Sequence, residues 1–223
     1  SPLAVGVASS DTSSDSHKMG IAASQPAEPS TENRAFVFIK PHALTEAVQE
    51  LVSSTLTKGG FNILEEGRID ATIIDEKKLI DQHYYAIASK ATILKPAELN
   101  VPAAKFKEKF GLEWSEALSK SLVFNAMDAC KKLGVDAAQM ASMWNQAKDA
   151  GQLIKFGGGF YCGKLTTGQG DLYVFNGFFM SMRAKFVEPG SAIYYYVVSW
   201  DAAKTSWEDF RGKVLGPTDP KAA

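Results

Sequence analysis

The stretch Arg34-Ala35-Phe36-Val37-Phe38-Ile39-Lys40-Pro41 is the segment that decides the fold. Its apolar, aromatic and β-branched residues favour a buried strand, and the proline after Lys40 closes that strand because it has no backbone N–H to donate. Downstream, apolar residues recur with a helical period from Thr45, a natural N-cap, to Gly59-Gly60, and a second strand is predicted over 61–70. The chain therefore opens with a β-helix-β unit.

The middle of the chain is predicted to be mostly helical. A polar helix begins at Asp75, and the stretch from about Ala91 to Gly170 is expected to be helical apart from a glycine-rich loop at 155–163. That loop lacks the glycine spacing of the known phosphate-binding loops, so a tight turn or close backbone packing is the better interpretation of it. The expected elements that follow are a helix over 172–186, a core strand over 192–200 and a last helix over 205–214.

The composition is that of a soluble globular protein. The chain has 223 residues, 45% of them hydrophobic, and 24 Lys and Arg residues nearly balance 25 Asp and Glu residues. A formal net charge of -1 argues against nucleic acid or an anionic membrane as a partner. No apolar run reaches about 18 residues, so no membrane-spanning helix is expected. Cys130 and Cys162 are too few for a disulfide framework or a Cys-only metal site, and we expect both to be reduced packing residues.

Residues 1–33 are predicted to form a low-complexity tail. They contain many Ser and Thr residues and no aromatic residue, which leaves too little apolar surface to offset the entropy of ordering the chain. A protein partner is expected to hold such a tail in place. A remnant of an organelle-targeting segment, as in a plastid protein, is the second interpretation, although Asp11 and Asp15 are unusual in such segments. The sequence leaves the compartment open.

The strand ending in Lys40-Pro41, the helix after it, and Gln82-His83-Tyr84 together resemble the N-terminal half of a nucleoside diphosphate kinase. Near the other end, 190–200 resembles the long central strand of that family, and 212–220 is similar to its G-x-x-x-G-x-T-x-P segment. The resemblance implies an α+β fold of the ferredoxin-like kind, an antiparallel sheet with helices packed on it.

The resemblance divides the chain into three parts. Residues 34–90 and 172–223 correspond to the kinase-like domain, and 1–33 precede it as the tail. Residues 91–171 have no counterpart in the family and are expected to form an inserted helical lobe. The tail and this lobe are the surfaces expected to contact protein partners in a multi-subunit assembly.

The resemblance also implies a site for a nucleotide and Mg²⁺, if the family site is retained. Lys40 and Thr218 would be phosphate ligands, Lys213 would replace an Arg, and Tyr84 would line the site. Each position has a structural interpretation as well: Lys40 as a solvated strand end, Thr218 as a turn residue between prolines, and Tyr84 as a half-buried helix residue. No metal-ligating cluster is visible in the sequence.

No catalytic residue is assigned. The family's nucleophile is a His in an N-x-x-H-x-S-D stretch, and the chain ends before any such stretch. His42 follows Lys40 closely, but it adjoins Pro41 in a turn and has no identifiable partner, and His83 is interpreted as structural.

Three functions remain open from the sequence. The first is a nucleoside diphosphate kinase-like module without catalytic activity that serves as a structural or linker subunit of a larger assembly. The second is an active nucleoside diphosphate kinase, transferring phosphate through a phosphohistidine, whose C-terminal catalytic segment is missing from this chain. The third is a module that binds a nucleotide without transferring phosphate.

Overall fold

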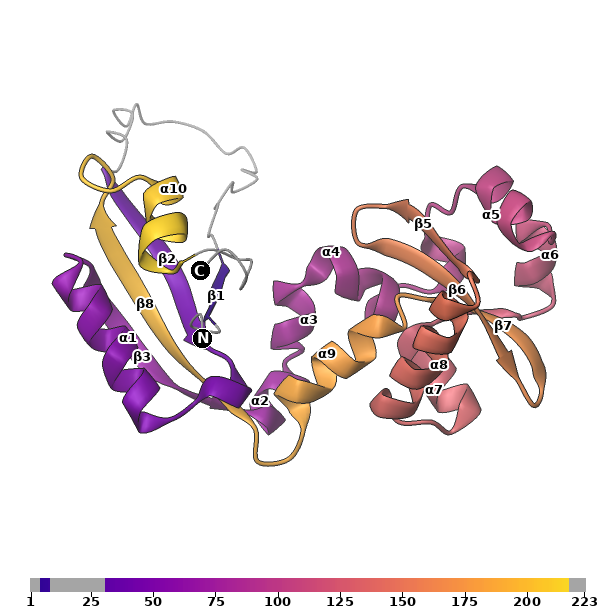
Figure 1. The fold of residues 1–223 in the computed structure, drawn as a ribbon, viewed down its shortest axis with the longest axis horizontal. Coiled ribbons are helices and arrows are strands. Elements are labelled where there is room, and N and C mark those ends of the chain that lie inside the picture. Colours follow the sequence, from indigo (N-terminus) through magenta and orange to yellow (C-terminus); the bar gives the residue numbers. More distant parts are fainter. Residues whose placement is uncertain (1–4, 9–30, 217–223) are drawn as a thin grey trace, which may run out of the picture. The chain divides into compact units, whose positions relative to one another are not determined.

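The computed structural model describes residues 5–8 and 31–216 and shows an α+β protein with two compact units (Figure 1). Unit 1 comprises Ser1–Ala71 and Gly190–Ala223, and unit 2 comprises Thr72–Pro189. The α+β class agrees with the prediction from the sequence. Within the described residues, no helix is long and apolar enough to cross a membrane.

Unit 1 is built on a four-stranded sheet in which every neighbouring pair is antiparallel. Its strands are β1 (Val5–Ala8), β2 (Glu32–Ile39), β3 (Asn62–Asp70) and β8 (Ala192–Asp201), in the order β1-β2-β8-β3. β8 pairs with β2 on one side and β3 on the other, so the continuous apolar run of β8 lies in the interior of the sheet, as predicted.

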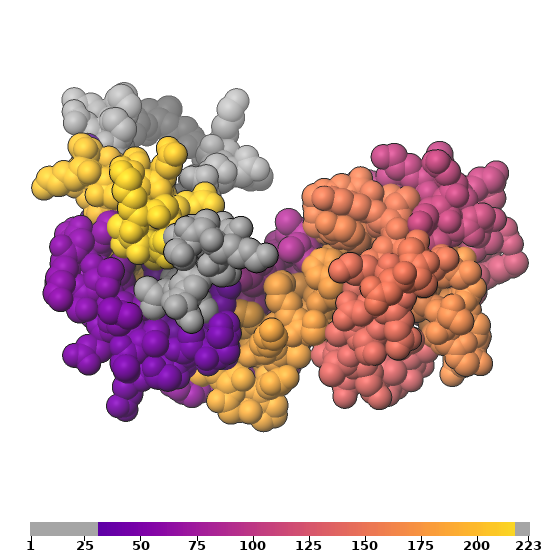
Figure 2. Space-filling model, viewed as in Figure 1, coloured from indigo at the N-terminus to yellow at the C-terminus, as the bar shows by residue number. Residues whose placement is uncertain are grey.

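The helices of unit 1 cover one face of this sheet. α1 (Glu46–Lys58) begins at Thr45, whose hydroxyl accepts a hydrogen bond from the Val48 N–H at 3.2 Å, and it buries Val52 and Leu56. The 3₁₀ turn η1 (Pro41–Ala43) precedes α1, and α10 (Trp207–Asp209) continues into the π-helical turn η4 (Phe210–Val214). Phe210 stacks on Trp200 with 4.5 Å between ring centroids and joins the cluster that α1 also contacts. In Figure 2, α10 and η4 form part of the viewed surface of unit 1.

Unit 2 contains a second sheet where the sequence analysis predicted only helices and loops. Its strands are β4 (Val123–Asn125), β5 (Leu153–Gly157), β6 (Phe160–Thr167) and β7 (Gly170–Phe175), in the order β4-β7-β6-β5. β4 is parallel to β7, and the other two pairs are antiparallel. The lobe expected as helical over 91–171 is therefore a mixed α/β structure.

Helices cover both faces of the unit 2 sheet. Along β7, Leu172 and Val174 belong to one hydrophobic cluster, whereas Tyr173 and Phe175 belong to another. This alternation explains why a helix predicted over 172–186 is wrong in its first part: a strand buried on both faces is a continuous apolar run, which periodicity cannot distinguish from a buried helix. The helices of unit 2 are α2 (Ala71–Glu76, whose first residue is in unit 1), α3 (Leu79–His83), α4 (Tyr85–Ala88), α5 (Ala103–Phe110), α6 (Trp114–Ser119), α7 (Ala126–Leu133), α8 (Ala137–Asp149) and α9 (Phe178–Val187), with the turns η2 (Ser89–Ile93) and η3 (Pro96–Glu98).

Two further boundaries differ from the sequence prediction. The stretch expected to be helical from about Ala91 is interrupted by β4, and Ser121, with a left-handed φ of 52°, lies between the end of α6 and the start of β4. Val5–Ala8 form β1 although 1–33 were expected to be a tail throughout. The glycine-rich stretch 155–163, in contrast, is a hairpin that turns at Gly158-Gly159 between β5 and β6, which confirms the tight turn.

The core of unit 2 requires glycine at two positions beside Trp144. A Cβ on Gly177 would lie 2.5 Å from Trp144 Cε3, and a Cβ on Gly163 would lie 2.9 Å from Trp144 Cζ3. Trp144 is buried against α9 and the sheet, so it has no room to move away. The two glycines allow the indole to lie directly on the backbone.

We expect Gly177→Ala to destabilise unit 2 by about 1–3 kcal/mol, because overpacking a well-filled core displaces neighbouring side chains. Urea unfolding followed by circular dichroism measures the change. Gly168→Ala is the matched control, since no atom lies within 4 Å of the added Cβ and its backbone is not left-handed. Equal stabilities for the two variants would contradict the packing argument.

Candidate functional site

Lys40 lies where β2 ends and the chain turns into η1. Its backbone is extended, with φ of -69° and ψ of 152°, and its carbonyl accepts a hydrogen bond from the Ala43 N–H at 2.9 Å. Pro41 begins the 3₁₀ turn, where a missing N–H costs nothing because the first donors of a helix have no internal partner. The Lys40 side chain is half-buried, and His42 beside it is exposed. This turn thus presents a cationic side chain at one end of the unit 1 sheet.

Lys213 belongs to the same unit but already has an anionic partner. Its Nζ lies 2.7 Å from Oδ1 of Asp209, one helical turn earlier, and this carboxylate raises the pKa of Lys213. The Lys213 side chain is 77% exposed. Exposed ion pairs of this kind contribute little to stability, so an incoming phosphate can compete with Asp209 for the ammonium.

Tyr84 and Thr218 are placed differently from the two lysines. Tyr84 lies in unit 2 between α3 and α4, where its ring meets the edge of His83 at 4.6 Å between centroids and packs against the cluster under α7, α8 and α9. Burial raises the pKa of the Tyr84 phenol. Thr218 lies outside the described residues. Of the four positions implied by the resemblance, the structure therefore places Lys40 and Lys213 in unit 1 and Tyr84 in unit 2.

The cysteines are packing residues, as expected. Cys130 and Cys162 are both buried and free. Burial raises the pKa of Cys130 to about 11 and that of Cys162 well above its usual value, so both thiols stay protonated at neutral pH. Within the ranges 5–8 and 31–216, no group of three or more His, Cys, Asp or Glu side chains is arranged to hold a metal ion.

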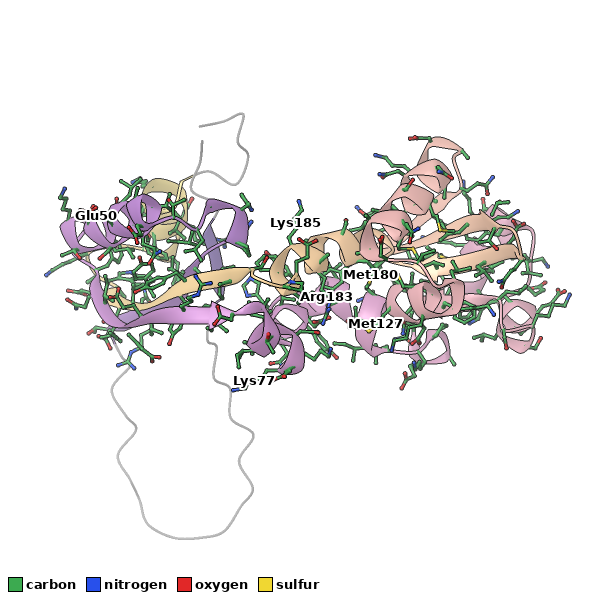
Figure 3. The ribbon with its side chains drawn as sticks, turned by 90° about the horizontal axis from the view of Figure 1, so that it is seen from below. Glu50, Lys77, Met127, Met180, Arg183 and Lys185 are labelled. Carbon is green, nitrogen blue, oxygen red and sulfur yellow. The ribbon has the colours of Figure 1, made fainter. Side chains whose placement is uncertain are left out.

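A buried ionic network is the most polar feature inside unit 2. Arg183 on α9 donates from Nε to both carboxylate oxygens of Asp81 on α3, at 3.1 and 3.0 Å, and from Nη2 to Asp75 at 2.5 Å. The Thr92 hydroxyl donates to the same Asp81 carboxylate at 2.7 Å. Asp81 is fully buried and Arg183 is 6% exposed. Figure 3 shows Arg183 and Lys185 on opposite sides of α9, and only Lys185 is exposed.

This network joins the helices of unit 2 rather than forming a ligand site. The guanidinium is committed to two carboxylates, and Asp81 accepts three hydrogen bonds, so neither group is available to a substrate. Sequence reasoning missed it because the pattern of α3 gives no sign of a partner that lies 102 residues further along the chain.

Asn176 is a second buried polar residue that the sequence analysis did not identify. It has a φ of 49° and no exposed surface, and its amide donates to the carbonyls of Ile87 at 2.9 Å and Gly159 at 2.8 Å. Its side-chain oxygen accepts a hydrogen bond from the Tyr161 N–H at 2.9 Å. Asn176 therefore fixes the glycine turn of the β5–β6 hairpin to the start of α9.

No family model, curated protein or solved structure matches the chain.

We expect Arg183→Met to destabilise unit 2 by about 3–5 kcal/mol, because it leaves the Asp81 carboxylate buried without its cationic partner. Lys185→Met on the exposed side of the same helix should change the stability by less than about 0.5 kcal/mol. Chemical denaturation followed by circular dichroism compares the two variants. Adding Asp81→Leu to Arg183→Met should recover part of the loss, since the unpaired charge is then gone. A double variant less stable than Arg183→Met would contradict this account.

The network also predicts an acid-dependent loss of stability. The hydrogen bond from Arg183 is the largest cause that holds the pKa of Asp75 below its usual 3.8. A carboxyl whose pKa is lower in the folded state contributes stability above its unfolded pKa, and this contribution is lost as the pH falls through the folded pKa. We therefore expect Asp75→Asn to flatten the pH dependence of the unfolding free energy below about pH 4. Lys78→Met should leave most of it, because Lys78 is the smaller cause.

Proposed function

We propose that this chain is a nucleoside diphosphate kinase-like module that acts as a structural subunit of a larger assembly. The observation that carries the proposal is the split β-α-β arrangement of unit 1. β2, α1 and β3 follow one another along the chain, and β8 lies between β2 and β3, antiparallel to both. A β-α-β unit with a strand inserted between its two parallel strands is the signature of ferredoxin-like folds. Lys40-Pro41 follows β2, at the position that the family resemblance requires.

Unit 2 supports the structural role. The chain enters it after β3 and leaves it before β8, so that Thr72–Pro189 separates two strands of the unit 1 sheet along the chain. Unit 2 has its own sheet, two hydrophobic clusters and a buried ionic network. Its sheet is covered on both faces and its surface includes α5, α6 and the β5–β7 hairpins (Figure 2). A separate folded unit of this size adds surface for protein contacts without adding a phosphate-binding group to unit 1.

Nucleotide binding has less support from the residues of unit 1 than the structural role has. A nucleotide with Mg²⁺ requires cationic side chains at its phosphates. Among the described residues of unit 1, the resemblance assigns this role to Lys40 and Lys213. Lys213 already forms an ion pair with Asp209, and a lysine cannot donate two parallel hydrogen bonds to a phosphate as an arginine does. These residues fit weak binding of a diphosphate better than tight binding.

We expect the purified chain to form no phosphohistidine from Mg-ATP labelled at the γ-phosphate and to transfer no label to GDP. An authentic nucleoside diphosphate kinase, assayed in parallel, is the positive control. Acid-labile label on the chain, together with labelled GTP, would overturn the structural proposal in favour of the kinase. His42→Asn and His83→Asn variants would then show whether either described histidine carries the phosphate.

The structural role itself is tested by the size of the particle that contains the chain. In a native extract the chain should elute well above its own 24.1 kDa, whereas the purified chain should elute at its own mass or at a small multiple of it. Elution of the endogenous chain at the same position as the purified chain would contradict the proposal. Calorimetric titration with Mg-ADP, repeated with Lys40→Ala, tests the nucleotide-binding module, because no binding at millimolar concentration would exclude it.

A further inference from the structure

Two large apolar side chains of unit 2 are exposed on one continuous helix. α4 runs directly into the π-helical turn η2, since the backbone is helical on both sides of the junction. Tyr85 on α4 is 56% exposed, and Ile93 on η2 is 43% exposed. Single exposed apolar residues are ordinary, so what matters is whether these two share a side of the helix. The other exposed large apolar side chains of the described residues lie on three separate elements and are Leu51, Leu64 and Ile73.

The π-helical turn brings Tyr85 and Ile93 toward the same side of the helix. In an α-helix with 3.6 residues per turn, side chains eight residues apart are rotated by about 80° from each other. In η2 the Leu94 N–H donates to the Ser89 carbonyl at 2.8 Å, five residues back, so this turn is wider and rotates less per residue. The offset between the two side chains is thereby reduced, and they lie about 12 Å apart along the axis. Such π-helical turns are frequent at functional sites.

Lys90 adds a positive charge beside this pair. It precedes Ile93 by three residues, so the two side chains are neighbours on the helix. Its Nζ donates to the Ala86 carbonyl at 2.7 Å and lies 5.5 Å from the centroid of the Phe160 ring. Lys90 pairs with no carboxylate of the described residues, so its charge is open to an anionic partner. The lysines of unit 2 that do pair with a described carboxylate are Lys78, Lys95, Lys107, Lys120 and Lys164.

The two segments that meet at Lys90 carry lysines and no acidic residue. Residues 82–97 and 150–170 each contain two Lys and neither Asp nor Glu. They meet where the turn between β5 and β6 lies against α4, since a Cβ on Gly159 would be 3.1 Å from Cγ1 of Ile87 (Figure 1). Unit 2 as a whole has 15 Lys and Arg residues and 12 Asp and Glu residues, although the complete chain is nearly neutral. This part of unit 2 therefore favours an acidic partner.

The helix and the hairpin turn are fixed to each other before any partner binds. The Asn176 amide donates to the carbonyls of both Ile87, at 2.9 Å, and Gly159, at 2.8 Å. The hairpin residue Phe160 lies under the Lys90 ammonium and limits where that side chain can go. A surface that is already ordered loses little conformational entropy when a partner binds to it.

We propose that α4 and η2 form a docking site for an acidic amphipathic helix of a partner protein, with Tyr85 and Ile93 as its apolar contacts and Lys90 as its contact for a carboxylate. A partner helix matches the spacing, because apolar residues at i and i+7 lie about 10.5 Å apart on one side of it. Tyrosine is among the residues that supply most of the binding energy at interfaces. The inference goes beyond the proposed structural role, because a transient partner of the same chemistry would use the same surface.

Synthetic helices test the site on the full chain. The probe EKELEKELKALEKEL carries four Leu in one stripe with Glu along both sides of the stripe. The matched control KEKLKEKLEALKEKL exchanges every Glu and Lys, and a second control carries Ser in place of the four Leu. Fluorescence anisotropy of the labelled peptides measures binding. We expect the probe to bind at least about threefold tighter than the charge-exchanged peptide, and the Ser peptide not to bind.

Variants of the chain decide whether the probe occupies α4 and η2. Tyr85→Ala and Ile93→Ser should each weaken binding of the probe at least about threefold, because each removes an apolar contact. Lys90→Met should remove the preference for the probe over the charge-exchanged peptide. The matched controls are Ile73→Ser, at an exposed isoleucine of α2, and Lys105→Met, at an exposed lysine of α5, and both should leave binding unchanged.

Three results would overturn the proposal: no binding of the probe at millimolar concentration, equal binding of the probe and the charge-exchanged peptide, or equal losses in the control variants and in Tyr85→Ala. Tighter binding of a thymidine oligonucleotide than of the probe would assign the surface to single-stranded nucleic acid instead. If Lys90→Met fails to fold, Tyr85→Ala and Ile93→Ser still give the decision, because both side chains are exposed. The elution of the endogenous chain is a separate measurement, so this proposal and the structural role can fail independently.

Discussion

The two-sided pairing of β8 is the constraint on which unit 1 depends. β2 and β3 run parallel to each other but are not hydrogen-bonded to each other, so they belong to one sheet only because β8 pairs with both of them. Val37 lies opposite Tyr196, and Ile69 lies opposite Ile193, so every pairing of β8 joins residues far apart in sequence. The helix α1 has no complete surface to pack on before β8 is in place, because Tyr196, Val198 and Trp200 are three of the six buried strand residues in the hydrophobic cluster that α1 contacts.

Unit 2 depends on a different balance between packing and polarity. Trp144 fills the space left by two glycines, and the Arg183 guanidinium donates hydrogen bonds to the fully buried Asp81 carboxylate. The apolar clusters supply most of the stability, whereas the ionic network and the Asn176 amide select one arrangement of the helices, since an alternative would leave a buried charge or amide without partners. The structure thus combines non-directional burial with a few directional contacts.

Local signals in the sequence predicted unit 1 better than unit 2. The apolar run before Lys40-Pro41, the Thr45 cap and the isolated apolar run of β8 each correspond to elements that form as predicted. β4 and β7 were missed because three or four apolar residues are too few to show a period of two or of 3.6, and only the sheet decides which way Leu172 and Tyr173 face. β1 was missed because it lies within residues 1–33, whose overall composition predicts a tail.

The sequence predicted single residues of the candidate site but not the contacts that they make. Lys40 lies at the strand end where the pattern placed it, but the pairing of Lys213 with Asp209 follows from helix spacing that the sequence analysis did not consider. The Arg183–Asp81 contact depends on the tertiary fold, since nothing in either segment indicates the other. Arg183 and Asp81 form an ion pair because the fold brings them together, and the composition of their segments does not indicate it.

The point at which unit 2 leaves and rejoins unit 1 has a consequence for the entropy of folding. Asp70 lies opposite Ala192, and the Ala71 N–H donates to the Ser191 carbonyl at 2.9 Å, so the two crossing points are as close as the ends of a hairpin turn. In polymer terms, unit 2 is the loop of a β3–β8 hairpin. An unfolded loop of that length opposes closure, whereas a folded unit with adjacent ends has already lost that freedom. Folding of unit 2 therefore acts as a turn former for the sheet of unit 1, and unfolding of unit 2 would weaken that sheet without breaking any of its contacts.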